Sequence, residues 1–165
     1  MGINQITENI QDLDAGKLKK LANLLDRNMS DDKEGYFIFY RLGGYLGKSD
    51  DAPEELEKNN SVFKGTCLIA KHYKSGPSDV PLMRAIRKSI TDSKKADRLE
   101  KQIIELLELP PEQVVTKLNR IISIATHGVR ISWDWNGFLW DLANWSNPER
   151  NVAVKWAKQW LFTEV

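Results

Sequence analysis

Hydrophobic residues recur every three or four positions along most of the chain, which is the spacing of helices that bury one face. Leucines at positions 18, 21, 24 and 25 form such a stripe within residues 17–27. The segment 36–42 is rich in aromatic and β-branched residues, so the pattern there leaves both a helix and a strand open. The helical pattern covers residues 17–27, 36–42, 61–73, 81–90, 93–109, 111–127, 134–145 and 148–162.

Proline, glycine and asparagine mark several helix boundaries. Pro81 suits the first turn of a helix, where the missing N–H of proline has no partner to lose. The Pro110-Pro111 pair is predicted to end one helix and open the next. Gly128 is predicted to end that helix. Asn147 and Pro148 are predicted to start the last helix as its N-cap and first helical residue.

These patterns predict an all-α fold of about eight or nine helices in two packed helical halves. The expected division is an N-terminal helical domain with a basic face, residues 1–92, and a C-terminal Trp-rich helical bundle, residues 93–165. The six tryptophans all lie in the last 33 residues. They suit either a platform that stacks unpaired bases or a packed core, and the i, i+4 spacing of Trp156 and Trp160 favours the core.

Composition excludes several classes of protein. The chain has 165 residues and 41% hydrophobic residues, without the roughly 18 consecutive apolar residues of a membrane span. The N-terminus lacks the basic and apolar regions of a secretory leader, so a cytoplasmic protein without membrane contact is expected. A lone Cys67 with His72 and His127 offers no disulfide and no zinc set. No metal or other cofactor is predicted.

Catalytic constellations are equally absent from the pattern. The glycines at 43, 44 and 47 lack the context and the Lys-Ser/Thr ending of a phosphate-binding loop. Asp134 and Asp141 fit one helix face, but a position at a helix N-terminus explains Asp134 more simply than acid/base chemistry. Cys67 is expected to be a core thiol and His72 an interfacial imidazole. The sequence therefore predicts a protein that is not an enzyme.

The net charge of +1 argues against nucleic-acid binding until it is divided by region. Residues 64–101 carry 10 basic and 4 acidic side chains, whereas residues 1–63 have a net charge of −4 and residues 102–165 a net charge of −1. Much of the acid lies at 30–35 and 49–57, which are predicted to be loops because polar residues cluster there with Gly or Pro.

The basic middle segment places its cations on helix faces. Arg84, Arg87 and Lys88 fall on one arc opposite the apolar face of their helix, and the next helix extends the set. One interpretation is an ordinary solvated surface, partly neutralised by neighbouring acids. The other is a surface that contacts phosphates without reading sequence and weakens with salt. The candidate residues are Arg84, Arg87, Lys88, Lys94, Lys95, Arg98 and Lys101.

Four segments, in this order and spacing, resemble the CasB family, the small subunit of the type I-E CRISPR surveillance complex, Cascade. The similarity extends over residues 36–47 and 82–165. The segments are Phe39-Tyr40-Arg41-Leu42, Leu82-Met83-Arg84-Ala85-Ile86-Arg87, Leu118-Asn119-Arg120-Ile121-Ile122, and Asp134-Trp135 followed by Trp145 and Glu149-Arg150.

The resemblance implies an all-helical, non-catalytic subunit present as two copies beside the backbone and large subunits. It implies support of the hybrid between guide RNA and target DNA and of the displaced DNA strand. By position it adds Arg41, Arg120 and Arg150 to the candidate nucleic-acid contacts, and Lys19-Lys20, following Gly16, correspond loosely to a basic pair of the family. The alternative from the residues alone is a helical protein–protein adaptor whose basic face docks an acidic partner.

Overall fold

The structure, a computed structural model, describes residues 2–27, 33–43, 53–127 and 129–163. In these ranges the regular structure consists of nine α-helices and one 3-10 turn without strands, which confirms the all-α prediction. The elements are α1 (Ile3–Ile10), α2 (Ala15–Asn23), α3 (Lys33–Leu42), α4 (Pro53–Lys71), η2 (Tyr73–Ser75), α5 (Leu82–Lys88), α6 (Ser93–Leu107), α7 (Pro111–Thr126), α8 (Trp135–Ala143) and α9 (Val152–Leu161).

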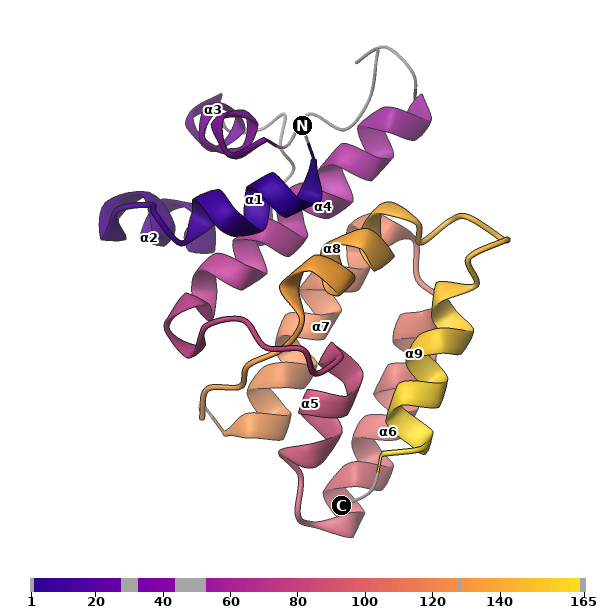
Figure 1. Ribbon diagram of the computed structural model, residues 1–165. Helices are drawn as coiled ribbons and strands as arrows, with labels where there is room; N and C mark the ends of the chain where they lie inside the picture. The colour runs from indigo at the N-terminus through magenta and orange to yellow at the C-terminus, as the bar shows by residue number, and fades with distance from the viewer. Residues whose placement is uncertain (1, 28–32, 44–52, 128, 164–165) are drawn as a thin grey trace.

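Helix α4 crosses the middle of the molecule (Figure 1). All residues from 61 to 70 are buried, since α2, α7 and α8 each pack against the helix. Gly65 permits the close approach of α8. A Cβ atom there would overlap Leu142 Cδ1 and lie 2.8 Å from Leu139 Cδ2, so a side chain at this position would push the two helices apart.

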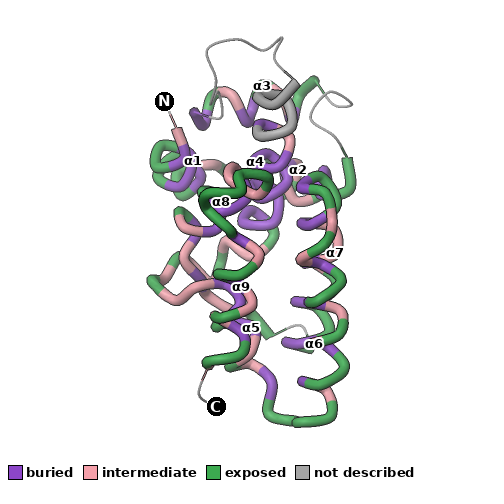
Figure 2. The backbone as a smooth tube through the Cα atoms, turned by 90° about the vertical axis from the view of Figure 1, so that its right-hand side faces the viewer, coloured by how far each residue is buried: buried purple, intermediate pink, exposed green. Residues whose placement is uncertain are grey.

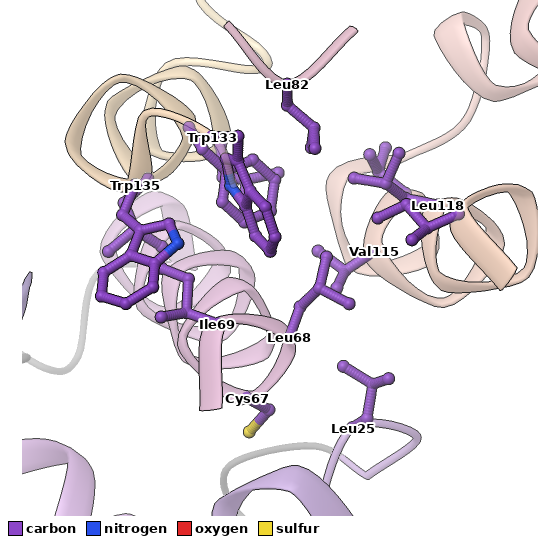
Figure 3. Close-up of a cluster of buried hydrophobic side chains, with 14 of the residues drawn as sticks. Leu25, Cys67, Leu68, Ile69, Leu82, Val115, Leu118, Trp133 and Trp135 are labelled. Atoms are coloured by element: carbon purple, nitrogen blue, oxygen red, sulfur yellow. The ribbon is translucent and has the colours of Figure 1, made fainter. Parts of the chain in front are cut away.

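Side chains from both halves of the sequence meet around α4 (Figure 3). One buried cluster joins the α2 segment, α4, α5, α7 and the start of α8. The predicted division between residues 92 and 93 stays a prediction. Residues from both sides of it contribute to this one core. The labelled members are Leu25, Cys67, Leu68, Ile69, Leu82, Val115, Leu118, Trp133 and Trp135.

Helices α6 and α7 form an antiparallel pair in which buried and exposed positions alternate at helical spacing (Figure 2). Their inward residues come from the apolar stripes seen in the sequence, such as Leu99 and Ile103 of α6. Helix α7 begins at Pro111, within the proline pair predicted to open it. Pro81 was predicted to lie in the first turn of a helix, but it is the N-cap residue of α5, which begins at Leu82. It ends at His127, whose φ of 48° is left-handed, while the predicted stop residue Gly128 lies outside the described residues.

The segment 36–42 is helical, because Ile38, Phe39 and Leu42 share one buried face at helical spacing. The loop predictions beside it need correction. Residues 33–35 already belong to α3, and α4 begins at Pro53, so the second half of the acidic stretch 49–57 is helix. Glu and Leu are good helix formers, and proline suits the first helical turn. The rest of both stretches lies largely outside the described residues.

The predicted start of the last helix at Pro148 is wrong. Asn147 does accept a hydrogen bond from the Glu149 N–H at 3.0 Å, but it caps only a turn. Asn151 then adopts a left-handed conformation with φ of 48°, which interrupts a helix, and α9 starts at Val152. The turn brings Arg150 into one groove with Val154 and Lys155 of α9.

Candidate nucleic-acid interface

Helix α5 carries cations on the side that its core residues leave free. Arg84 and Lys88 are one helical turn apart and both exposed. Neither makes an ion pair with any residue that the structure describes. The buried residues that fix this orientation are Leu82, Met83, Ala85 and Ile86.

An open groove of about 570 Å³ lies where α5 faces α9, and we refer to it as the α5–α9 groove. Half of its lining residues are Arg or Lys, and none is Asp or Glu. Such a one-sided concave lining concentrates positive potential and attracts anions. The lining residues are Arg84, Arg150, Asn151, Val154, Lys155, Lys158, Gln159 and Phe162.

Arg84 and Arg150 are among the candidates predicted from the sequence, whereas Lys155 and Lys158 are not. A signal for them is present in the sequence. The helical spacing that turns Trp156 and Trp160 into the core places these lysines on another side of the same helix. Phe162 follows one turn after Lys158 and is 73% exposed, which adds an aromatic surface to the groove.

Asp141 of α8 fixes α9 beneath this groove. Its Oδ1 atom lies 2.7 Å from Lys155 Nζ, and its Oδ2 atom accepts a hydrogen bond from Trp156 Nε1 at 2.8 Å. The carboxylate is largely buried, whereas the lysine is about half exposed. Asp141 therefore neutralises part of the charge that Lys155 contributes to the groove.

Asp141→Ala and Asp141→Asn are expected to differ in effect. The alanine variant leaves the buried Trp156 N–H unpaired, which should lower the free energy of unfolding by about 1–3 kcal/mol. The asparagine variant retains an acceptor but removes the charge. It should cost less stability and bind nucleic acid more tightly, because Lys155 is no longer neutralised. Chemical denaturation measures the change in stability, and fluorescence anisotropy measures the change in affinity for nucleic acid. Weaker binding by Asp141→Asn than by the wild type would contradict the proposed neutralisation of Lys155.

Arg87 and Lys95 are only partly available to a ligand, because both contribute to packing. The guanidinium of Arg87 lies 5.6 Å from the centre of the Trp160 ring, which gives a cation–π contact. Lys95 donates from Nζ to the carbonyl of Ala125 at 3.2 Å, near the C-terminal end of α7, where a cation is favourable. These two residues connect neighbouring helices.

Lys94, Arg98 and Lys101 form a separate exposed row along α6, at spacings of four and three residues. None of them lines the α5–α9 groove. Between this row and α9, Glu100 accepts a hydrogen bond from Trp160 Nε1 at 3.0 Å. This hydrogen bond connects α6 to α9, although the exposed cations of α6 do not enter the groove.

The remaining candidates are dispersed over other elements. Arg120 lines a different groove at α7. Arg41 is exposed on α3, and Lys19 is exposed on α2. Lys20, on α2, forms an ion pair with Glu34 at 3.5 Å. These residues do not join the α5–α9 groove, and their contacts with nucleic acid stay predictions.

Most of the tryptophans serve the core. Four are buried, and Trp145 donates from Nε1 to the carbonyl of Leu109 at 3.0 Å while its ring meets that of Trp156 edge to face. Only Trp140 is largely exposed, at 52%. The preference for core packing over a stacking platform is therefore confirmed for the set as a whole. The buried four are Trp133, Trp135, Trp156 and Trp160.

Cys67 and His72 lie where the sequence analysis expected them. Cys67 is fully buried, and this burial strongly raises the pKa of its thiol, which makes it unreactive. His72 is half-buried with its ring 5.6 Å from that of Trp133. Burial first, and then the charge of Lys71, lower the pKa of His72 from 6.5 to about 4.

This lowered pKa predicts a loss of stability in mild acid. The folded state holds His72 neutral, whereas the unfolded chain gains a proton near pH 6.5, so the contribution to stability is full above pH 6.5 and declines as the pH falls toward 4. His72→Phe retains a ring beside Trp133 and removes the titration. The thermal midpoint of this variant should fall less than that of the wild type between pH 7 and 5, and equal slopes would contradict the assignment.

No cluster of three or more His, Cys, Asp or Glu side chains suited to a metal ion occurs in the described ranges. Within the same ranges, no helix is both long and apolar enough to cross a membrane. The concentrated chemistry of this surface is cationic, with amides and an aromatic ring beside it.

Comparisons with solved structures support the fold. CasB of M. ruber superposes with a TM-score of 0.62 at 19% identity, covering 90% of this chain and 85% of that one. A CRISPR-associated protein of the Cse2 family from Thermus thermophilus superposes with a TM-score of 0.58 at 23% identity, covering 94% of this chain and 97% of that one. At these identities the likeness shows a common fold.

Sequence comparisons add the family. The CRISPR-associated protein Cse2 of Thermus thermophilus is 26% identical over 117 residues, which make up 70% of this chain and 63% of that relative. The family profile described as CRISPR-associated protein Cse2 matches residues 20–160, nearly the whole chain. With an all-helical fold shared with CasB and Cse2 structures, the chain belongs to the Cse2 family of CRISPR-associated proteins.

Proposed function

We propose that this chain is a non-catalytic small subunit of a type I-E CRISPR Cascade complex and that its α5–α9 groove holds nucleic-acid backbone without reading sequence. Membership of the Cse2 family supports the assignment to the complex. The observation that carries the binding role is the groove itself, in which four cations face one open volume with no acidic residue in the lining.

The groove suits a sugar-phosphate backbone more than a base edge. Arg84, Arg150 and Lys158 offer charge to phosphate oxygens, and such contacts position a nucleic acid without specifying sequence. Val154 and Phe162 add apolar surface for sugars or an unpaired base. In the complex this arrangement would stabilise the hybrid of guide RNA and target DNA together with the displaced DNA strand.

The near-neutral total charge fits a binder that acts within an assembly. Acidic segments elsewhere offset the basic ones, so the isolated chain should bind weakly. The expected partners are guide RNA, the two DNA strands, the backbone and large subunits, and a second copy of this chain. Co-expression with those subunits should give a complex that contains this chain and the guide RNA. The absence of this chain from an otherwise intact complex would refute the assignment.

A direct binding measurement separates this proposal from the adaptor alternative. Fluorescence anisotropy with labelled single-stranded and duplex DNA should show weak binding at about 50 mM salt, equal for unrelated sequences. The affinity should fall linearly on a log–log plot as salt rises, by nearly one unit of slope per phosphate contact. An absence of binding at low salt, with capture of an acidic peptide instead, would favour the adaptor.

A further inference from the structure

We infer that a second groove, lined by residues of α4, α6 and α7, is a binding site for a phosphate group. This groove, which we refer to as the Lys64 groove, has a volume of about 380 Å³ and shares no lining residue with the α5–α9 groove. Its volume lies within the roughly 300–1,000 Å³ of pockets that accept small molecules. The residues that bear on the inference are Lys64, Gln113, Thr116, Lys117, Arg120 and Glu112.

The first observation is a buried ammonium group with too few partners. Lys64 lies in the core helix α4 and is only 7% exposed. Its Nζ atom donates to the carbonyl of Glu112 at 2.6 Å, and among the described residues no carboxylate forms an ion pair with it. An ammonium has three donors, and a buried charge is costly unless it is compensated. An anion in the groove would supply this compensation.

The second observation is the location of that ammonium beside the first turn of α7. The free N–H groups at the start of a helix give this end a partial positive charge. Lys64 adds a full positive charge at the same place, since its acceptor Glu112 is the second residue of α7. The ammonium group therefore adds to the positive potential near this helix end, which favours an anion in the groove.

The third observation is the convergence of further donors on the same volume. Gln113, Lys117 and Arg120 of α7 are spaced by four and three residues, and therefore lie along one face of the helix. Lys117 is paired with Glu105 at 2.6 Å, whereas Arg120 has no ion-pair partner among the described residues. The guanidinium can bind two oxygens of a phosphate at once, which matches the geometry of that group.

Glu112 is the one acidic residue in the lining. A variant of Glu112 should therefore change the affinity for phosphate in the opposite direction to a variant of Arg120. The Glu112 carboxylate competes with an incoming anion for the same cations. Removal of this charge should therefore strengthen binding, while removal of the Arg120 charge should weaken it. A merely structural contact between Lys64 and α7 predicts neither change.

The test uses inorganic phosphate and the full chain carrying Arg84→Glu and Lys158→Glu, so that the α5–α9 groove does not contribute. Calorimetric titration at constant ionic strength should show binding of phosphate. Arg120→Gln should raise the Kd about ten-fold, Glu112→Gln should lower it, and the exposed Arg130→Gln should leave it unchanged. Lys64→Met, which retains the length of the buried chain, should abolish binding.

Two competitors identify the source of the phosphate. Displacement of inorganic phosphate by an oligonucleotide without terminal phosphates would assign the site to nucleic-acid backbone, and displacement by AMP alone would assign it to a free nucleotide. Either result supports the site. No heat of phosphate binding beyond that of chloride, or an unchanged Kd in Arg120→Gln, would overturn it even if Lys64→Met fails to fold. Because the α5–α9 groove is already disabled, the outcome is independent of the proposed function.

Discussion

Charge reversal of Arg84 and Lys158 together is expected to weaken binding of single-stranded and duplex DNA by on the order of 100-fold at low salt. Both residues line the α5–α9 groove, and neither pairs with a described acidic group, so their charges are available to phosphates. Glutamates at these positions would remove two contacts and add two repulsions. The salt dependence should also become shallower, by about one unit of slope for each lost contact.

The control is a variant with the same change in net charge at another place. Lys74 and Arg130 are exposed and lie outside both grooves. Their joint replacement by glutamate should change affinity only through the long-range field, about three-fold or less, because exposed charges are screened beyond roughly 10 Å at 0.1 M salt. Equal losses in the two double variants, measured by fluorescence anisotropy, would show that net charge matters and the groove does not.

Trp156→Ala should produce the largest loss of stability. The ring is 1% exposed and packs on Phe138 and Trp145, and its N–H is the donor to Asp141. Truncation of a large aromatic side chain in a core costs about 3–5 kcal/mol, to which the lost hydrogen bond to Asp141 Oδ2 adds. Since α9 and the residues that flank it supply all the lining of the α5–α9 groove except Arg84, binding of nucleic acid should be lost with it.

Trp140→Ala provides the matched control, because the same side chain is removed from a site that is 52% exposed. Its effect on the free energy of unfolding should stay below about 1 kcal/mol. Trp156→Phe, which retains an aromatic ring without the N–H, should fall between the two. Chemical denaturation measures all three variants, and a Trp140→Ala variant as unstable as Trp156→Ala would contradict the assignment of core and surface.

Eight of the described helices could be predicted from the sequence because each buries a stripe of regular spacing, whereas α1, which buries Ile3, Ile6 and Ile10, was not among the predicted segments. The segment 36–42 was ambiguous, since its composition suits a strand while Ile38, Phe39 and Leu42 suit a helix, and packing decided between them. The start of α9 was missed because Pro148 is a favourable first helical residue. The left-handed Asn151 that delays the helix has no comparable sequence signal.

The candidate site was predictable in part. The cations of α5 stood out because they lie close together in the sequence, and Arg150 followed from the resemblance to CasB. Lys155 and Lys158 are separated from Arg84 by about seventy residues, so only the packing of α9 against α5 brings them together. The net charge of their region also did not point to these two lysines, because residues 102–165 are slightly acidic overall.

The complete burial of residues 61–70 has a consequence for how the molecule unfolds. A helical segment that is buried on every side is unstable in water once its neighbours leave, so this part of α4 cannot persist as a separate folded unit. Its backbone amides are therefore expected to exchange with solvent deuterium only when the whole chain opens. Their exchange rates would report the global free energy of unfolding, and both grooves would be lost in that same event.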